Sequence, residues 1–393
     1  MKIFLLISHN VNGGGEKVFS DLLENLSHKY EIIGIQTYNT NTTFSNQNNV
    51  VLYNRTTSLI KRIFHILLLP IHYIHLFKKC SPSISISLTP IENIMNIFAC
   101  RLMGVKPIVS FHSDPFSKFQ NTLERVQSKL LIILIYLFDV DVITVSQYIK
   151  EMLHNKCHIP NEKITAIYNP IDIKNIQDKS KEYSEMDKHN TIFISVGRLS
   201  HEKSIQHIIR AFAKYLEYNK GTLYICGEGP EEVYLKQLTI NYKIQDSVIF
   251  LGWQKNPYKY MAQASVLIQS SITEALPLVL AEAMACGCPI IATKCSSGIA
   301  EIIGTDGKCG ILTSKVSGNR HSSNIPLEIG EEDILNSMIA LHTNKILRDK
   351  MSDECLNRVL LFDKEIGIEQ YIKLIERIEN SYKCTYKEKD HIR

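Results

Sequence analysis

Short apolar runs alternate with longer amphipathic segments along most of the chain. In the first half, the runs typical of strands fall near residues 2–8, 30–38, 48–54, 83–88, 107–112, 140–146 and 164–169. Helical spacing of apolar positions lies between most of them, near residues 15–28, 58–79, 91–103, 120–138 and 147–155. Because strands that alternate with helices form parallel sheets covered on both faces, this pattern predicts an α/β domain.

The same alternation restarts after a polar break. Residues 174–190 are almost devoid of large apolar side chains and are interpreted as a linker. Strand-like runs then follow as TIFISVG, TLYICG, DSVIFLG, SVLIQSS, PIIATK and GILTS. We therefore expect two doubly wound, Rossmann-like α/β domains facing across a cleft, over residues 1–173 and 191–362. A final amphipathic helix near residues 363–382 either caps the second domain or returns to the first.

The composition is that of a globular protein, with 393 residues of which 45% are hydrophobic and 21% charged. A net charge of +4 gives no basic field that favours nucleic acid. The ten cysteines form no metal-binding or disulfide framework, so we expect reduced thiols in a cytoplasmic protein. The N-terminal MKIFLLIS is interpreted as a buried first strand, and no transmembrane helix is expected because no apolar run reaches about 18 residues.

The most informative segment is SSITEALPLVLAEAMACGCPII, residues 270–291. Glu274 and Glu282 lie eight positions apart across an expected strand-to-helix junction. Pro277 is expected in the first turn of the helix and Gly287 at its end. Glu274 therefore falls on the loop before the helix, and Glu282 in the helix itself.

Backbone amides complete this segment as a candidate nucleotide-sugar site. The unpaired amides at the positive end of the helix dipole, a ready site for phosphate, belong to Leu276, Leu278 and Val279. In this arrangement Glu274 would bind sugar hydroxyls, the amides the diphosphate, and Glu282 the ribose. The alternative is a capped helix with two solvated acids.

Two further loops after strands have residues suited to a phosphorylated ligand. Gly13, Gly14 and Gly15 open the first helix and allow a ligand to approach the backbone closely, or form a tight turn without a ligand. The pattern is not G-x-G-x-x-G, so a nicotinamide dinucleotide is disfavoured. Arg198 and Lys203 lie on one loop, where both can stabilise a leaving diphosphate without a metal, unless they are solvated cations.

The remaining candidate residues have weaker patterns. His112 ends a first-domain strand and either faces the cleft or is structural. Gly227 and Gly229 suggest a floor for a nucleotide, and Trp253 either stacks near a base or belongs to the core. The sequence Asp139-Val140-Asp141 has a D-x-D form but is interpreted as a strand entrance, so no metal site is expected.

Residues 58–79, SLIKRIFHILLLPIHYIHLFKK, combine apolar positions at helical spacing with basic residues at both ends. Pro70 is expected to break this helix. The pattern suits an interfacial segment on an anionic membrane, and the alternative is a core helix with basic ends. The apolar run Leu130–Phe138 is interpreted as part of a core helix, because it is too short to span a membrane.

These motifs, in this order, resemble retaining glycosyltransferase family 4, whose members have the GT-B fold, over nearly the full length. The matching segments are Gly13-Gly14-Gly15-Glu16, His112, Asn169-Pro170-Ile171-Asp172, Val196-Gly197-Arg198 with Lys203, Glu274 with Glu282, and AEAMACGCPIIAT. The resemblance implies transfer of a sugar from a nucleotide-sugar to a hydroxyl acceptor, with retained anomeric configuration and with neither metal nor cofactor. It also implies front-face attack, Glu274 as a sugar anchor, and a final helix that returns to the first domain.

By the same resemblance His112, Arg198, Lys203 and Glu274 are the candidate catalytic residues. The candidate donor-binding residues are Gly14, Gly15, Gly197, Gly229, Leu276, Leu278, Val279 and Glu282. Two departures stand out: Ala275 replaces the usual glycine, which would narrow the sugar pocket, and Lys294 and Ser296 replace an acid and a proline. The segment that contains these two residues, KCSSGIAEII, resembles a T-D-C-P-S-G-x-x-E-I form of transferases that use UDP-linked sugars. The resemblance therefore implies a UDP-linked donor, with the sugar open.

The leading hypothesis is a sugar transferase that extends a glycan or lipid-linked acceptor for capsule, lipopolysaccharide or O-antigen. The basic apolar segment at 58–79 motivates a lipid-linked acceptor and a peripheral position on the inner face of the membrane. A second hypothesis is another GT-B enzyme, such as a nucleotide-sugar epimerase, which needs no added acceptor. A non-catalytic sugar-nucleotide-binding protein is the third, and an NAD-dependent dehydrogenase the least favoured.

Overall fold

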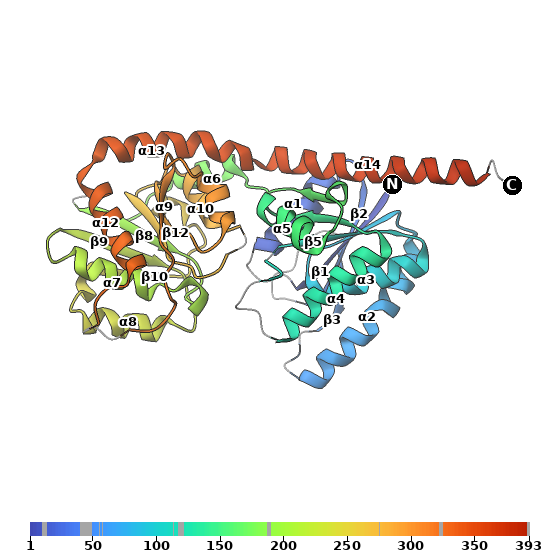
Figure 1. Ribbon diagram of the computed structural model, residues 1–393, viewed down its shortest axis with the longest axis horizontal. Coiled ribbons are helices and arrows are strands. Elements are labelled where there is room, and N and C mark those ends of the chain that lie inside the picture. Colours follow the sequence, from blue (N-terminus) through green and yellow to red (C-terminus); the bar gives the residue numbers. More distant parts are fainter. Residues whose placement is uncertain are drawn as a thin grey trace. The chain divides into compact units, whose positions relative to one another are not determined.

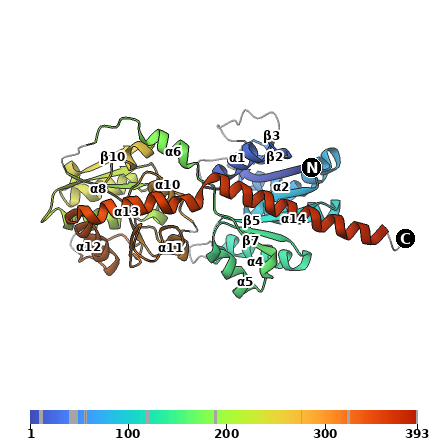
Figure 2. The same ribbon diagram turned by 90° about the horizontal axis from the view of Figure 1, so that it is seen from above.

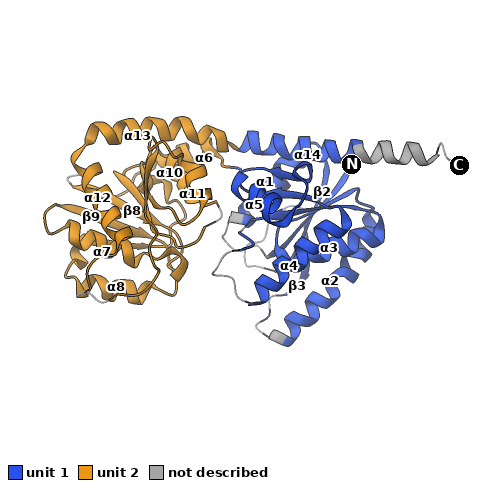
Figure 3. Cartoon of the chain, in the orientation of Figure 1, with its two compact units in different colours: residues 1–170, 364–393 blue, residues 171–363 orange. Residues whose placement is uncertain are grey.

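The computed structural model describes residues 1–9, 14–39, 49–54, 56, 58–112, 114–116, 122–186, 190–274, 276–321 and 325–390. The chain forms two compact units (Figure 3). Unit 1 consists of Met1–Pro170 and Lys364–Arg393, and unit 2 of Ile171–Asp363. Each unit has a parallel sheet with helices, so the predicted fold class of two doubly wound α/β domains is confirmed.

The sheet of unit 1 has seven parallel strands in the order β3-β2-β1-β4-β5-β6-β7 (Figure 1). The strands are β1 (Lys2–His9), β2 (Glu31–Tyr38), β3 (Asn49–Tyr53), β4 (Ile84–Ser87), β5 (Lys106–Phe111), β6 (Asp141–Thr144) and β7 (Ile164–Ala166). In β1, residues 3–7 form an unbroken buried apolar run, as a strand covered on both faces requires. The chain order reverses between β1 and β4, which is where ligands bind in open α/β sheets.

Helices cover both faces of this sheet. Helix α1 (Gly14–Leu26) and α14 (Lys364–Asp390) pack in one apolar cluster with β1, and Figure 2 shows α14 lying across the strands. On the opposite face α2 (Leu59–Cys80) and α3 (Pro90–Met103) form a second cluster with β1, and α4 (Thr122–Phe138) packs beside α3. Helix α5 (Gln147–Cys157) and the short η1 (Asn161–Lys163) precede β7. The final helix therefore belongs to unit 1.

The sheet of unit 2 has six parallel strands in the order β10-β9-β8-β11-β12-β13. They are β8 (Thr191–Val196), β9 (Gly221–Cys226), β10 (Val248–Gly252), β11 (Val266–Gln269), β12 (Ile290–Thr293) and β13 (Gly310–Thr313). The helices are α6 (Ile173–Ser180), α7 (Gln206–Tyr215), α8 (Glu232–Asn241), α9 (Tyr258–Met261), α10 (Leu278–Ala285), α11 (Ser297–Ile303), α12 (Ile329–Thr343) and α13 (Lys345–Arg358). Three short turns of 3₁₀ helix are η2 (His201–Lys203), η3 (Gln245–Ser247) and η4 (Val359–Phe362).

Three details differ from the sequence interpretation. Helix α6 occupies part of the segment interpreted as a linker, because Asp172 caps its first turn by accepting from the Asn175 amide at 3.0 Å, while Ile173 and Ile176 are buried. Helix α2 continues through Pro70 rather than breaking there. Helix α4 is not a core helix, because only Leu131, Leu134 and Ile135 of its side chains are buried.

Helix α2 also bears on the expectation of no transmembrane helix. Among the described residues it is the one helix long and apolar enough to cross a membrane, over Ile60–Cys80 with a mean hydropathy of 1.2. Basic and histidine residues interrupt its apolar runs, which is why no uninterrupted run marked it in the sequence. Its inner face packs in unit 1 through Leu69, Tyr73 and Phe77, all at most 2% exposed.

Candidate active site

Three loops at the carboxyl ends of neighbouring strands in unit 2 are joined by backbone hydrogen bonds. The amide of Gly197, after β8, donates to Cys226 O at 3.0 Å, and the amide of Leu199 donates to Glu228 O at 2.9 Å. The amide of Gly227, after β9, donates to Gly252 O at 2.8 Å. The loop that contains Arg198 is therefore fixed against the C-G-E-G turn that the sequence identified as a floor.

Glycine is required where these loops meet. A Cβ atom on Gly227 would lie 1.9 Å from Gly197 O, and one on Gly229 would lie 2.3 Å from Leu199 O. Both contacts are backbone oxygens, which no rotamer change can relieve. Gly197 therefore lies against Gly227, and Gly229 against Leu199, so both glycines predicted to bind the donor lie where these two loops meet.

Glu274 is held at one of its two carboxylate oxygens. Its Oε1 accepts hydrogen bonds from Lys203 Nζ, from Gln269 Nε2 at 2.9 Å and from Ser271 Oγ at 2.8 Å. The Glu274 side chain is only 14% exposed and that of Lys203 27%. Within the described parts of the chain, Oε2 accepts no hydrogen bond, so this oxygen remains available to a hydroxyl group.

The loop of Lys203 is fixed to the loop of Glu274 by further bonds. Ser270 Oγ donates to Ser204 O at 2.8 Å, and the amide of Ile272 donates to Glu202 O at 2.9 Å. Lys203 ends η2 and Glu274 follows β11, and β8 and β11 are neighbours in the sheet. The sequence predicted both residues as catalytic but not their direct pairing, and it missed Gln269 and Ser271.

Arg198 is exposed and forms no ion pair with any residue that the structure describes. It lies on the same loop as Lys203, as predicted. Nearby, hydrogen bonding from Ser200 lowers the pKa of the Glu202 carboxyl, and the positive charge of Arg198 contributes. Arg198 is therefore available to a ligand anion, whereas Lys203 is already paired with Glu274.

The second acid lies on α10, as the sequence predicted. Glu282 Oε1 accepts from Tyr258 Oη at 3.3 Å, and burial together with the Glu282 charge raises the pKa of Tyr258. The sequence gave no indication of Tyr258, because a lone tyrosine at a loop end has no spacing that relates it to Glu282.

The start of α10 supplies the predicted amides but differs in one detail. Pro277 is the N-cap residue, with ψ at 103°, and not a residue of the first turn. The side chain of Pro277 makes no capping hydrogen bond. Leu278 and Val279 are its first two residues, so their amides have no acceptor within the helix, and Leu276 precedes them. Ala275 lies outside the described residues.

The unit 1 candidates lie at the carboxyl edge of their own sheet. Gly14 and Gly15 are the first residues of α1, directly after β1, and a Cβ atom on Gly15 would meet nothing within 4 Å. Gly13 lies outside the described residues. His112 follows β5, and its Nε2 lies 2.9 Å from Ser110 Oγ. Burial lowers the pKa of His112 to about 4, so its imidazole is neutral at neutral pH.

The D-x-D sequence and Trp253, the two weaker candidates, are both explained by their local contacts and exposure. Asp139 Oδ2 pairs with Lys163 Nζ at 2.6 Å, and Asp141 Oδ1 pairs with Arg377 at 3.2 Å, so each acid of the D-x-D sequence has its own cation. Trp253 is 56% exposed and therefore not a core residue. Its amide donates to Glu228 Oε1 at 3.2 Å.

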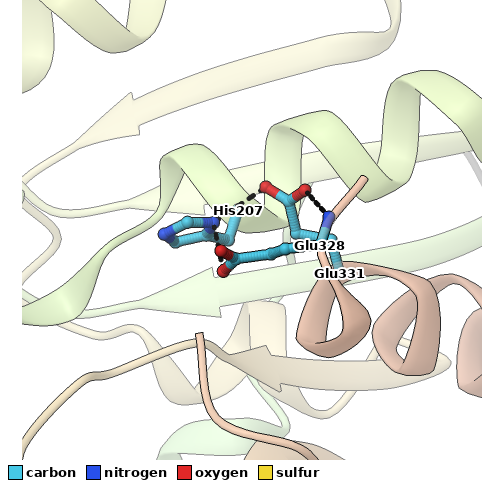
Figure 4. A group of neighbouring side chains, drawn as sticks. All are labelled: His207, Glu328 and Glu331. Carbon is cyan, nitrogen blue, oxygen red and sulfur yellow. Dashed lines mark hydrogen bonds and ion pairs between the residues drawn. The ribbon is translucent and has the colours of Figure 1, made fainter. Parts of the chain in front are cut away.

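A group of potential metal ligands lies outside the predicted site (Figure 4). His207 Nδ1 lies 2.8 Å from Glu331 Oε1 and 3.4 Å from Glu328 Oε1. Gly318 donates its amide to His207 Nε2 at 3.2 Å, so in a neutral ring Nδ1 bears the proton and donates to Glu331. The fully buried Arg210 donates to the same Glu331 oxygen at 2.6 Å. These groups satisfy one another and form a structural ion-pair cluster.

Two family models match consecutive parts of the chain. Residues 12–175 match glycosyltransferase family 4, and residues 176–321 match glycosyl transferases group 1. With the fold and the site described above, these matches show that the chain belongs to the group 1, family 4 glycosyltransferases. The protein is therefore a glycosyltransferase with the two-domain GT-B fold.

Individual relatives agree with this class. The chain is 28% identical over 316 residues to an uncharacterized glycosyltransferase of Methanocaldococcus jannaschii, covering 74% of this chain and 77% of the relative. It is 33% identical over 187 residues to the N-acetylgalactosamine-N,N'-diacetylbacillosaminyl-diphospho-undecaprenol 4-alpha-N-acetylgalactosaminyltransferase of Campylobacter jejuni, covering 48% of this chain and 50% of the relative. The alignment thus spans half of that enzyme.

Solved structures show the same fold. HepE of Anabaena, in complex with UDP and glucose, superposes with a TM-score of 0.77 at 19% identity, over 96% of this chain and 99% of that chain. At this identity the likeness defines the fold.

Proposed function

We propose that this glycosyltransferase moves a sugar from a UDP-linked donor to a hydroxyl of a glycan or lipid-linked acceptor. The transfer retains the anomeric configuration and needs no metal. It serves the synthesis of a surface polysaccharide such as capsule, lipopolysaccharide or O-antigen. The observation that supports this most directly is the Lys203–Glu274 pair. It lies at the carboxyl edge of the unit 2 sheet, beside a loop with the exposed Arg198 and near the first amides of α10.

Each part of this edge suits one part of a nucleotide-sugar. The amides of Leu278 and Val279 suit phosphate oxygens, and Arg198 supplies a cation for the charge that develops on the leaving diphosphate. Lys203 is the second cation of that loop. Glu282, oriented by Tyr258, suits a ribose diol.

The role available to Glu274 supports the proposed front-face, retaining mechanism. Three donors converge on its Oε1, so the lone pairs of this oxygen are engaged in hydrogen bonds and it is a poor nucleophile. Its Oε2 suits a hydroxyl of the donor sugar. In front-face attack the acceptor oxygen bonds to the anomeric carbon as the bond to UDP breaks, and the acceptor proton passes to the leaving phosphate. Arg198 supplies the charge stabilisation for which other transferases use a divalent metal. Lys203, while paired with Glu274, adds to it through the N–H donors of its ammonium group that Glu274 does not use.

A lipid-linked acceptor is supported by two observations. The Campylobacter relative acts on a diphospho-undecaprenol-linked sugar. Helix α2 combines exposed apolar side chains with Lys61, Arg62, Lys78 and Lys79 and has no acidic residue. We accordingly propose a cytoplasmic protein attached to the inner face of the membrane, with α2 at the surface. Changing those four residues to glutamate should release the protein from isolated membranes, and a variant that still sediments with them would contradict the attachment.

The donor is tested by thermal shift of the purified protein with UDP, GDP, ADP, NAD and a panel of UDP-sugars, without metal and in the presence of a chelator. We expect stabilisation by UDP-sugars that is lost in Arg198→Ala and Glu282→Ala. Product formed from the selected donor is then analysed by NMR for the anomeric configuration. An inverted product, or stabilisation by NAD alone, would overturn the proposal.

Leaving out the acceptor distinguishes the proposed transferase from the epimerase alternative. A transferase consumes donor at a rate that depends on added acceptor, whereas an epimerase converts the nucleotide-sugar without one. Incubation of donor alone, followed by chromatography of the sugar nucleotides, therefore distinguishes the two.

A further inference from the structure

Helix α4 of unit 1 has a continuous stripe of large apolar side chains that none of the described residues of the unit covers. They recur every three or four positions, and their exposed fractions are Leu123 65%, Val126 56%, Leu130 40%, Ile133 53% and Leu137 66%. Tyr136, 67% exposed, flanks the stripe. The opposite side of the helix is anchored in the unit by the buried Leu131, Leu134 and Ile135. A soluble helix normally turns such a stripe inward, so this outward stripe indicates a binding surface.

The stripe on α4 is matched by one on α2. The exposed side chains there are Ile60, Ile63, Phe64, Leu67 and Ile71, between 51% and 81% exposed. Helix α3 packs against both α2 and α4, so the three helices form one layer on the same face of the sheet (Figure 1). Helix α3 adds Leu102, which is 73% exposed. Exposed apolar side chains are therefore present on all three helices of the layer and are not confined to α2.

The charges of the layer favour an anionic occupant. Helix α2 contains only basic charged residues, and α4 contains Arg125 and Lys129 against the single acid Glu124. Helix α3 adds the exposed Arg101, and its one acid, Glu92, is buried. A second copy of the chain would bring basic helices against basic helices. Anionic lipid headgroups would instead neutralise them while the apolar stripes enter the acyl region.

We propose that α4 is a second lipid-binding helix, and that α2 and α4 together rest on an anionic bilayer as one interfacial platform. This inference deepens the membrane attachment of the proposed function, which α2 alone had motivated. The N-terminal ends of both helices follow the carboxyl ends of strands, α2 after β3 and α4 after β5. The N-terminal ends of both helices therefore lie at the carboxyl edge of the unit 1 sheet, the edge that also contains Gly15 and His112.

An interfacial position suits α2 better than a membrane span. To span, α2 would have to withdraw Leu69, Tyr73 and Phe77 from the core and break the stacking of Tyr53 on His65, whose rings lie 3.9 Å apart. A span would also leave the stripe on α4 uncovered. The platform explains both stripes without unfolding unit 1.

The test is flotation of the full-length protein with vesicles of phosphatidylcholine, with and without phosphatidylglycerol. Ile133→Gln/Leu137→Gln on α4 should lower the vesicle-bound to free ratio by about tenfold or more, as should Leu67→Gln/Ile71→Gln on α2. The matched control is Val233→Gln/Ile240→Gln on α8 of unit 2. The side chains of Val233 and Ile240 are 82% and 54% exposed, and this variant should bind vesicles as the unchanged protein does.

Each other outcome contradicts the platform. Full binding by the α4 variant would show that α2 acts alone. If the vesicle-bound protein resisted extraction with alkaline carbonate, α2 would span the bilayer. If the unchanged protein were a dimer and the α4 variant a monomer, a second copy of the chain would be the occupant of the stripe. Flotation needs neither donor nor acceptor, and a retained thermal shift with UDP-sugar shows that unit 2 is intact. Failure of the platform is thereby distinguished from failure of the proposed transferase activity.

Discussion

The ammonium group of Lys203 contacts Oε1 of Glu274, and this one carboxylate oxygen also accepts hydrogen bonds from Gln269 and Ser271. The two residues come from loops after neighbouring strands of unit 2 and are 71 positions apart in the sequence. The pairing leaves Oε2 for a ligand and sets the direction of that oxygen. The function of the site therefore depends on the pair and not on either residue alone.

Breaking the pair should separate stability from activity. We expect Lys203→Met to lower the free energy of unfolding by about 1–3 kcal/mol, because it leaves a mostly buried carboxylate without its cation. The double variant Lys203→Met/Glu274→Gln should regain most of this stability, since the charge is removed with its partner. Both variants should lose at least about 100-fold in kcat/KM. Urea unfolding and a sugar-transfer assay measure the two effects, and full activity in the double variant would rule out the assigned roles.

Tyr258 should affect donor binding and leave the chemical step unchanged. Tyr258→Phe removes the hydroxyl that donates to Glu282 Oε1, so the carboxylate loses an orienting hydrogen bond of about 1 kcal/mol. We expect KM for the donor to rise about fivefold with kcat unchanged. Tyr260→Phe is the matched control, because it removes a hydroxyl that donates to the neutral Gln254 at the same 3.3 Å. Equal effects of the two substitutions would show that Tyr258 is only structural.

Much of the fold could be predicted because its strands are buried. Strands β1 and β2 begin and end within one residue of the predicted limits. For β1 the reason is that a parallel strand covered on both faces requires an unbroken apolar run. From the sequence, bounds were predicted for the strands of unit 2 but not for most of its helices. Helix α13 shows one reason, because KILRDKMSDECLNR has many charges and only Met351 and Cys355 are buried. Helix α4 was assigned to the core because its residues 130–138 are apolar on all sides, and a sequence does not show which side meets solvent.

The candidate site likewise contains residues that the sequence could identify and residues that it could not. Glu274 and Glu282 could be identified because the turn between them imposes a local spacing. Gln269 and Ser271 are ordinary polar residues whose role arises only when the loop after β11 folds back toward Lys203. Tyr258 reaches Glu282 from α9, 24 positions earlier in the chain. Tertiary contacts of this kind leave no periodic pattern in one sequence.

Two glycines of the candidate site should respond oppositely to alanine. In Gly229→Ala the new Cβ would lie 2.3 Å from Leu199 O, so we expect a loss of about 1–3 kcal/mol of stability. Gly15→Ala meets nothing within 4 Å and lies in α1, where alanine favours the helix, so its melting temperature should not fall. If α1 binds phosphate through its first amides, Gly15→Ala should nevertheless raise KM. Calorimetry and steady-state kinetics measure both, and an unstable Gly15→Ala would contradict the described helix start.

His112 should remain neutral through the physiological range and make the protein less stable in acid. Burial lowers its pKa from 6.5 to about 4, so the folded state takes up a proton less readily than the unfolded state. Its contribution is therefore fully present above about pH 6.5 and is lost as the pH falls towards 4, by at most about 1.4 kcal/mol per pH unit. His112→Gln should flatten this part of the stability curve relative to the unchanged protein. Urea unfolding across the range measures the slope, and NMR titration of the imidazole gives the pKa directly. A ring that titrates near 6.5 would contradict the buried environment and would permit an imidazolium at the sheet edge.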